Sequence, residues 1–400
     1  MASTDSRYLI NQAEIADHGL QVDWGDGHQS HFHSVWLRHQ CECDACGTPM
    51  NAVRALRIHH IPEDISIASF EFNHQQVKIG WSQGAHHSTY KARWLRDHCY
   101  SDGERKLRKH RPVLWDASIG QNPPVFNFKE AEADSATRLA MLESVCDYGF
   151  CKIENLSGNM DESNRLIELV GTQRQTHFGN YQLSKKSSIN NVGDIKHELQ
   201  PHCDETYRTS TIGITVFQVM QPSSEGGEST LMDGFEAARR LRQNFPSEFE
   251  LLTRTPVFAQ RYDPDHAEGE LPRLYQCRLP MIRLDADGDI SGVRINERQM
   301  APLDLPANQI EPCYRAIRHL MKIVYDPDLL ITFSLKKGEG LLFDNQRVLH
   351  GRTAFEAEQP GRSVLTNSVN LEDFYSNLRV LTTQHKPDQP PRTYAQGLVV

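Results

Sequence analysis

Residues 340–352 read GLLFDNQRVLHGR, and this stretch is the most informative one about the fold. Its apolar first part has the length of a buried strand, and Asp344-Asn345 supplies a turn. A second apolar run then leads into His350. The stretch therefore predicts a strand and a turn that deliver an imidazole to a defined point of the fold.

A second motif lies far upstream, where residues 199–205 read LQPHCDE. In an extended chain residues i and i+2 point the same way, so His202 and Asp204 face a common point. Together with His350 they predict the facial arrangement of two histidines and one carboxylate found in non-haem Fe(II) oxygenases, which leaves room for a co-substrate and O₂. His-x-Asp alone is a weak signal in a chain with 19 histidines. The conjunction with His350 is much stronger.

Arg362 lies twelve residues after His350, just before the apolar run 364–369. Such an oxygenase needs a cation for the distal carboxylate of 2-oxoglutarate. The fork of a guanidinium binds a carboxylate through two hydrogen bonds, so Arg362 is the expected contact.

Composition narrows the class of protein. The 400 residues favour two domains, and 43 Lys and Arg against 52 Asp and Glu give a net charge of −9, which argues against nucleic-acid and anionic-membrane partners. No run approaches the ~20 apolar residues of a membrane span, and MASTDSRYLI lacks the pattern of a secretory signal. Nine unevenly spread cysteines favour a reduced, cytoplasmic compartment over a disulfide scaffold.

The expected domains are a β-rich module over 1–115, a second domain over 116–385 and a Pro-rich tail over 386–400. Short strands are expected at 20–24, 70–72 and 77–81, and later ones at 150–153, 212–220, 229–232, 330–333, 341–343 and 364–369. Helices are expected at 128–146, 161–169 (with Asp161 as N-cap), 234–243 and 310–324. Many strands with few βαβ units predict a sandwich or barrel. No internal repeat is evident.

Three thiols are clustered in Cys41-x-Cys43-x₂-Cys46, and His86 and His87 follow later. Three thiolates and one imidazole make a closed, structural Zn(II) site. The alternative is three free buried cysteines.

Four stretches carry a family resemblance, and they are Trp36-Leu37-Arg38, Gly226-Gly227-Glu228-Ser229, Met232-Asp233-Gly234-Phe235 and the run 343–352. With them the chain resembles the γ-butyrobetaine and trimethyllysine dioxygenases over most of its length, although that family more often has valine where Met232 stands. The resemblance implies a mainly β fold with flanking helices, in which a distorted double-stranded β-helix (jelly roll) follows a small zinc-binding domain. It also implies a homodimer that uses Fe(II), 2-oxoglutarate and O₂, with ascorbate as reductant.

The resemblance also assigns residues. It implies that His202, Asp204 and His350 bind iron, that Arg362 binds 2-oxoglutarate, and that Thr332 is a further 2-oxoglutarate contact. His86 is favoured over His87 as the fourth zinc ligand because residues 86–90 resemble a His-x-Ser-x-aromatic segment of the family.

The family's substrates carry a trimethylammonium group, which aromatic faces and negative charge recognise. Tyr181, Phe178 and Tyr207 are the cage candidates, and Phe178 is equally explained by core packing. The butyrobetaine enzymes have a cage tyrosine three residues after an asparagine, whereas here Asn191 is followed by Asp194 at that spacing. Asp194 either faces the cation or is a solvated turn residue.

At the anionic end of the substrate, Asn296-Glu297 is followed by Arg298, where the butyrobetaine type has an asparagine. A guanidinium suits a more highly charged group such as a phosphonate. The same group includes an enzyme type acting on 2-(trimethylammonio)ethylphosphonate, which is therefore favoured over γ-butyrobetaine or another betaine. The alternative for Arg298 is a surface residue paired with an acid. Two other functions are less well supported. A taurine-type dioxygenase would lack the cysteine module, which this chain has. A non-enzymatic binding protein should have lost at least one iron ligand, whereas all three are present here.

Overall fold

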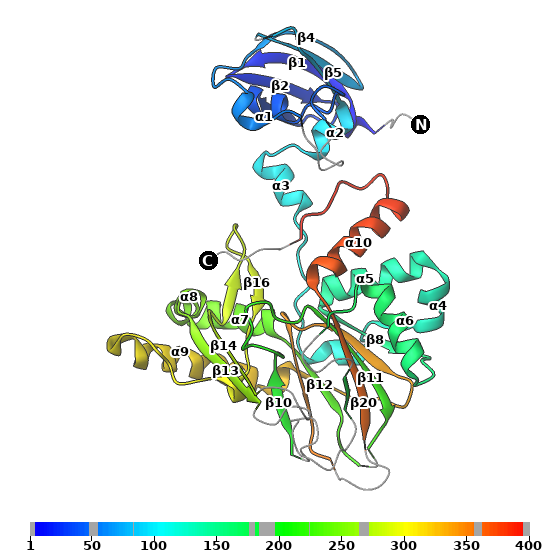
Figure 1. Cartoon of the computed structure of the whole chain (residues 1–400), viewed down its shortest axis with the longest axis vertical. Coiled ribbons are helices and arrows are strands. Elements are labelled where there is room, and N and C mark those ends of the chain that lie inside the picture. Colours follow the sequence, from blue (N-terminus) through cyan, green and yellow to red (C-terminus); the bar gives the residue numbers. More distant parts are fainter. Residues whose placement is uncertain are drawn as a thin grey trace. The chain divides into compact units, whose positions relative to one another are not determined.

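The structure is a computed structural model that describes residues 5–47, 55–82, 84–175, 197–223, 225–263, 272–355 and 362–394, and the backbone of 181–183. The chain divides into two compact units, shown in Figure 1. Unit 1 comprises Met1–His110 with Pro390–Thr393, and unit 2 comprises Arg111–Gln389 with Tyr394–Val400.

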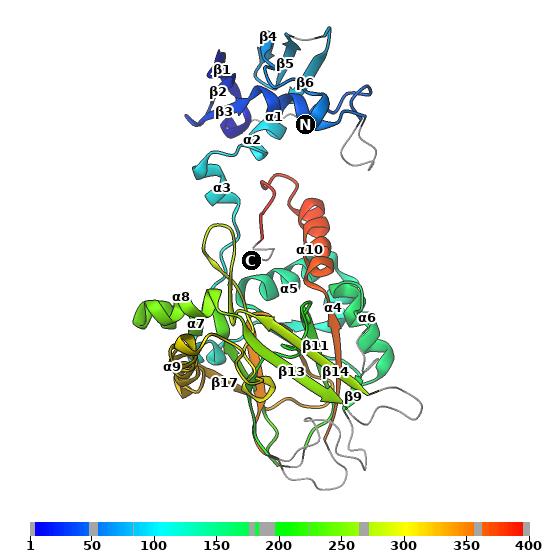
Figure 2. The same cartoon turned by 60° about the vertical axis from the view of Figure 1, so that its left-hand side comes forward.

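Unit 1 contains two three-stranded antiparallel sheets, each followed by a short helix. Figure 2 shows both sheets and their helices. The first sheet and helix are β1 (Ile10–Ala16), β2 (Gly19–Trp24), β3 (Gln29–His33) and α1 (Ser34–His39). The second sheet and helix are β4 (Ile67–Asn73), β5 (Gln76–Trp81), β6 (His87–Lys91) and α2 (Ala92–Asp97). Helix α3 (Asp102–Arg108) follows α2, and two 3₁₀ turns lie at Ser6–Tyr8 and Ile58–His60. Alternating apolar residues of both sheets form one buried core.

Unit 2 is built on two facing sheets. The first has the order β7-β8-β18-β11-β20-β9 and consists of β7 (Val125–Asn127), β8 (Phe150–Glu154), β18 (Gly340–Asp344), β11 (Ile214–Gln221), β20 (Ser363–Val369) and β9 (Tyr181–Leu183). The second has the order β10-β19-β12-β17 and consists of β10 (Leu199–His202), β19 (Val348–Arg352), β12 (Ser229–Asp233) and β17 (Leu330–Phe333). Apolar side chains from both sheets meet in one core between them. This is the predicted double-stranded β-helix.

Helices cover the outer faces of the two sheets. Against the larger sheet pack α4 (Phe128–Ala133), α5 (Ser135–Tyr148), α6 (Met160–Val170) and α10 (Leu371–His385). Against the smaller one pack α7 (Gly234–Asn244), α8 (Pro246–Arg254) and α9 (Ala307–Val324). The remaining elements are the hairpins β13 (Val257–Asp263)–β14 (Arg273–Leu279) and β15 (Ile282–Leu284)–β16 (Ile290–Val293), and the 3₁₀ turns Ala117–Gln121, Glu297–Gln299 and Pro327–Leu329.

Two expected helix boundaries are wrong for reasons of capping. The helix expected over 128–146 is two helices, because the Asp134 side chain accepts hydrogen bonds from the Ala136 and Thr137 amides and starts α5. The cap of α6 is Asn159 rather than Asp161, since its side chain accepts from the Glu162 amide.

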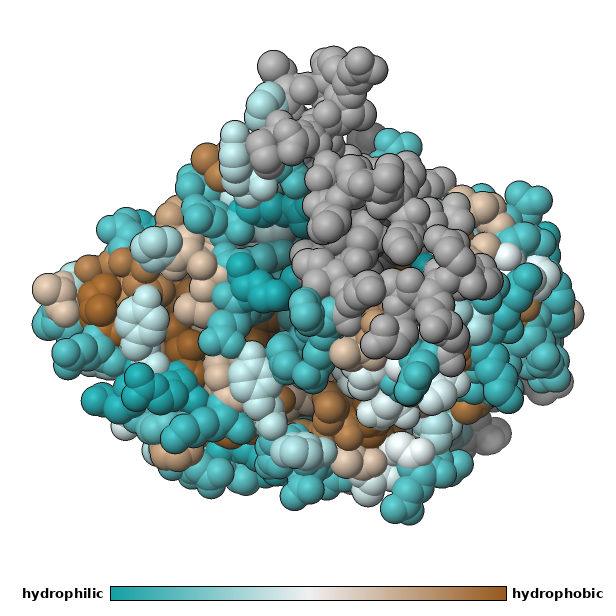
Figure 3. Space-filling view, turned by 90° about the horizontal axis from the view of Figure 1, so that it is seen from below, coloured by the Kyte–Doolittle hydropathy of each residue, from teal (hydrophilic) through white to brown (hydrophobic). Residues whose placement is uncertain are grey.

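No described helix combines the length and apolar composition that a membrane crossing needs. Hydrophilic and hydrophobic residues are intermixed on the face of Figure 3.

Candidate active site

Two antiparallel strands bring the predicted histidines together. β10 pairs with β19 so that His202 lies directly opposite His350. Directly paired residues project to the same side of a sheet, and the two imidazole centroids are 4.3 Å apart.

Asp204 completes the cluster just after β10. Its Oδ1 lies 3.4 Å from His202 Nε2, and its Oδ2 lies 3.3 Å from His350 Nε2. One ligand atom of each residue lies within 4.8 Å of the others. Cis ligands about 2.1 Å from one octahedral ion would be about 3.0 Å apart, so a small contraction of this cluster fits Fe(II).

The protonation states of the cluster also suit a bound metal cation. His202 Nδ1 lies 2.9 Å from the Gln200 carbonyl and donates to it, which leaves the lone pair on Nε2. Burial lowers the pKa of His202, which favours the neutral ring. Burial alone would raise the pKa of Asp204, but the two neighbouring imidazoles hold it well below its usual range. An ionised carboxylate and neutral imidazoles are the metal-binding forms.

Backbone contacts fix the loop that carries Asp204. The Asp204 amide donates to Asn345 Oδ1 at 2.8 Å, and Asn345 Nδ2 donates to the Asp204 carbonyl at 3.1 Å. On the other side, Asn296 Nδ2 donates to the Cys203 carbonyl at 3.0 Å. Sequence reasoning placed Asn345 in the turn before β19 and did not predict its contacts with Asp204.

Arg362 is the cation expected for 2-oxoglutarate. Its guanidinium lies over the Phe217 ring at 5.6 Å, and within the described residues it has no hydrogen bond or ion pair. Burial, with a smaller contribution from Arg352, lowers the pKa of Arg362 to about 10. A half-buried cation without a counter-ion is costly, so the site favours an anionic ligand here.

Thr332 is not brought to this cluster. It pairs with Thr230, which in turn pairs with Gly351, whereas His350 pairs with Leu231. Neighbouring residues of a strand point to opposite faces. Thr332 therefore lies on the face opposite His350 and is exposed, which argues against the predicted 2-oxoglutarate contact.

The predicted substrate residues have different surroundings from one another in the structure. Tyr207 is buried and stacks on Tyr275 at 5.7 Å. Asn296 is buried. Its amide nitrogen donates to the Cys203 carbonyl, and its Oδ1 has no hydrogen-bond partner among the described residues. The Tyr181 backbone pairs with Thr366 of β20. Phe178, Asn191 and Asp194 lie outside the described residues.

Arg298 is exposed and near the cluster. Its positive charge contributes to the lowered pKa of His202. Glu297, the neighbouring acid in the sequence, accepts a hydrogen bond from the Tyr325 hydroxyl at 2.6 Å. Among the described residues Arg298 has no hydrogen bond or ion pair, so its guanidinium is available to a ligand.

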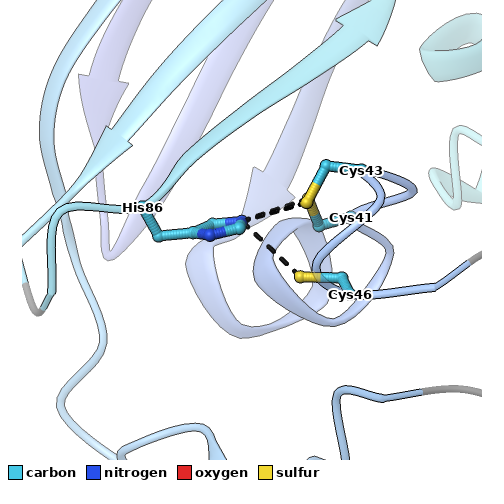
Figure 4. Close-up of side chains that lie close together, drawn as sticks. All are labelled: Cys41, Cys43, Cys46 and His86. Carbon is cyan, nitrogen blue, oxygen red and sulfur yellow. Dashed lines mark hydrogen bonds between the residues drawn. The ribbon is translucent and has the colours of Figure 1, made fainter.

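Unit 1 brings the predicted zinc ligands together. Figure 4 shows the three thiols around the His86 ring. His86 Nε2 lies 3.3 Å from Cys41 Sγ, 3.7 Å from Cys43 Sγ and 3.6 Å from Cys46 Sγ. A thiolate at about 2.3 Å and an imidazole at about 2.0 Å from one tetrahedral Zn²⁺ would lie about 3.5 Å apart, so the donor set fits this ion. All nine cysteines are free of disulfide bonds.

Comparisons with known proteins show which family the chain resembles. The family model described as taurine catabolism dioxygenase TauD, TfdA family matches residues 106–367, and the gamma-butyrobetaine hydroxylase-like N-terminal model matches 12–96. A trimethyllysine dioxygenase of Meyerozyma guilliermondii is 30% identical over 92% of this chain and 94% of its own. A gamma-butyrobetaine dioxygenase of Pseudomonas sp. (strain AK-1) is 28% identical over 93% and 96%. A solved taurine dioxygenase from Burkholderia xenovorans covers 65% of this chain and 89% of its own, with 10% identity and a TM-score of 0.48.

The match to the TauD model covers more than half of the chain, and that to the Meyerozyma enzyme nearly all of it. The chain therefore belongs to the TauD, TfdA family and is an iron- and 2-oxoglutarate-dependent dioxygenase.

Proposed function

We propose that this dioxygenase hydroxylates an unactivated carbon of a small trimethylammonium zwitterion, and that 2-(trimethylammonio)ethylphosphonate is its leading candidate substrate. The relatives named for trimethyllysine and gamma-butyrobetaine support the cationic end of this substrate. One observation supports the phosphonate end. The Arg298 guanidinium lies near the His202–Asp204–His350 cluster and has no hydrogen bond or ion pair among the described residues.

The proposed roles follow from the geometry. His202, Asp204 and His350 hold the iron, and Arg362 pairs with the distal carboxylate of 2-oxoglutarate. When bound, the iron with 2-oxoglutarate and O₂ supplies the oxidation that turns C–H into C–OH and releases succinate and CO₂. Arg298 holds the anionic end of the substrate and so positions one carbon. Tyr181, Asn191, Asp194, Tyr207 and Asn296 stay predicted substrate contacts.

The second candidate is γ-butyrobetaine or another betaine. The Pseudomonas relative favours it, because that protein is named for γ-butyrobetaine and matches nearly the whole chain. Under this alternative a carboxylate occupies the anionic end, and Arg298 serves another purpose.

The test is succinate formation with Fe(II), ascorbate and 2-oxoglutarate against γ-butyrobetaine, trimethyllysine, glycine betaine and 2-(trimethylammonio)ethylphosphonate. For wild type we expect the phosphonate to dominate. Arg298→Asn should lower its kcat/KM about 10- to 100-fold, the size of a lost charge-assisted hydrogen bond. Arg254→Asn, which changes an exposed arginine paired with Glu250 on α8, is the matched control and should have no effect. Dominant γ-butyrobetaine turnover that Arg298→Asn leaves unchanged would contradict the phosphonate assignment.

We also propose that Cys41, Cys43, Cys46 and His86 bind a structural Zn²⁺. Metal analysis of the purified chain should find one zinc per chain. A homodimer and a cytoplasmic location stay predictions of the sequence.

A further inference from the structure

The two sheets of unit 1 have the same register. In the first sheet Ile10 pairs with Trp24 and Ala16 with Gly19. In the second, Ile67 pairs with Trp81 and Asn73 with Gln76, each 57 residues later in the chain (10 to 67, 24 to 81). Even the irregularity near the start of β1 recurs near the start of β4. Unit 1 thus consists of two copies of one β-β-β-α arrangement.

Side-chain contacts repeat as well. Trp24 Nε1 donates to Ser30 Oγ at 2.8 Å, and Trp81 Nε1 donates to Ser88 Oγ at 2.9 Å. α1 contains Trp36-Leu37-Arg38, and α2 contains Trp94-Leu95-Arg96 at the same positions. The Trp36 and Trp94 rings meet with centroids 5.4 Å apart.

The duplication gives the zinc site a counterpart. In the first half Cys41 follows α1, and its imidazole partner His86 comes from the segment before β6. In the second half Cys99 follows α2, and its imidazole partner His28 comes from the segment before β3. The Sγ–Nε2 distance is 3.3 Å for Cys41 and His86 and 3.6 Å for Cys99 and His28. Each half therefore lends one imidazole to the other half's cysteine.

The other two ligands are present in one half only. Counting from the cysteine after each helix, Cys43 corresponds to Ser101 and Cys46 corresponds to Glu104. Cys99 Sγ is within 3.5 Å of Ser101 Oγ. The second site keeps two of the four metal ligands.

A buried ion network lies beside this second site. Arg38 donates to Cys46 Sγ at 3.2 Å in the first half, and its counterpart Arg96 donates to Glu104 Oε1 at 2.8 Å. The Arg96 and Glu104 side chains are each 2% exposed. Arg96 also pairs with Asp26 at 2.9 Å, and Arg7 pairs with Glu104 at 2.6 Å. Buried charges need such partners, and here protein groups neutralise one another without a metal.

We propose that unit 1 is an internal duplication in which the second half carries a vacated metal site, at Cys99 and His28, whose metal has been replaced by the Arg7–Glu104–Arg96–Asp26 network. This inference rests on the proposed zinc in the first half. The second site lacks only two thiolates, so Ser101→Cys with Glu104→Cys makes it a Cys₃His zinc site.

The experiment measures metal per chain in the full-length protein, by elemental analysis and by the thiolate-to-Co²⁺ absorbance after cobalt replaces zinc. Wild type should hold one ion, and the Ser101→Cys/Glu104→Cys variant two, with twice the cobalt absorbance. The control Ser101→Ala/Glu104→Ala disrupts the same network without adding ligands and should hold one. One ion in both wild type and the double-cysteine variant would overturn the second site. A wild type without zinc would instead contradict the first-half site under the proposed function.

The reverse exchange, made in the first half, tests whether an ion pair can replace the metal even where the double-cysteine variant does not fold. Cys43→Ser with Cys46→Glu gives the first half the second half's residues, and Cys43→Ser with Cys46→Ala is its matched control. Both should lose zinc. The glutamate variant should unfold at the higher temperature, because Arg38 keeps an acceptor, as Arg96 does with Glu104. An equal or lower Tm than that of the alanine variant would overturn the claim that an ion pair replaces the metal.

Discussion

Single side chains outside the proposed ligand set hold the proposed iron ligands in place. Asn345 holds both backbone groups of Asp204, through hydrogen bonds of 2.8 and 3.1 Å, and is 1% exposed. Partners that orient a metal ligand are typically worth 10- to 100-fold in metal affinity.

Asn345→Ala should therefore lower Fe(II) affinity about 10- to 100-fold, because the Asp204 carboxylate is no longer held in place. Titration of the apoprotein with Fe(II) under anaerobic conditions measures this. Asn377→Ala is the matched control, since it also removes amide hydrogen bonds to backbone carbonyls, those of Leu169 and Val170 beside α10. It should reduce stability and leave the iron affinity unchanged. Equal affinities for Asn345→Ala and wild type would contradict the positioning role.

At the scale of elements, the turn between α5 and β8 limits how β19 can pack. Gly149 ends α5 with φ +81°, in the left-handed region. A Cβ at this position would lie 2.8 Å from Val348 Cγ2 and 2.9 Å from Arg347 Cδ, at the start of the strand that carries His350. The position thus needs glycine for both conformation and space.

Gly149→Ala should destabilise the protein by about 3 kcal/mol or more. This figure is the sum of the cost of a left-handed backbone at a non-glycine residue and the cost of overpacking. Gly288→Ala separates the two effects, because Gly288 has φ +82° and nothing within 4 Å of an added Cβ. That variant should cost about 1–2 kcal/mol. Urea unfolding measures both. Equal losses for the two variants would show that the contact with β19 carries no weight.

Elements with a buried apolar pattern could be predicted from the sequence, and those without it could not. The expected strand at 341–343 lies within β18, because its residues form a continuous buried apolar run. β13 and β14 were missed. In β13, Gln260 and Arg261 are polar and Tyr262 is exposed, so no buried apolar pattern marks the strand, which pairs with β14 in a two-stranded ribbon. The three iron ligands could be proposed from spacing, whereas the face on which Thr332 lies depends on register. The repeat in unit 1 was also missed. Its signal in the sequence is a scattered set of matches 58 residues apart, namely His28 with His86, Ser30 with Ser88, Trp-Leu-Arg in α1 and α2, and Cys41 with Cys99.

At the scale of the whole molecule, the two proposed metal sites belong to separate cores. The thiol cluster lies in unit 1, whose described core residues lie between positions 10 and 100. The His202–Asp204–His350 cluster lies in unit 2, beside the core between the two sheets of the β-helix. Binding energy at a structural zinc site stabilises the fold that presents the ligands.

Loss of zinc should therefore destabilise unit 1 and spare the iron site. Cys46→Ala removes one of the four proposed zinc ligands. We expect it to shift one calorimetric transition to lower temperature while Fe(II) affinity stays within twofold of wild type. The reciprocal variant, His350→Ala, should abolish Fe(II) binding and leave zinc content at one per chain. If Cys46→Ala abolishes Fe(II) binding in protein whose unit 2 transition is unchanged, the two sites are coupled, and the separation of cores does not describe how the chain works.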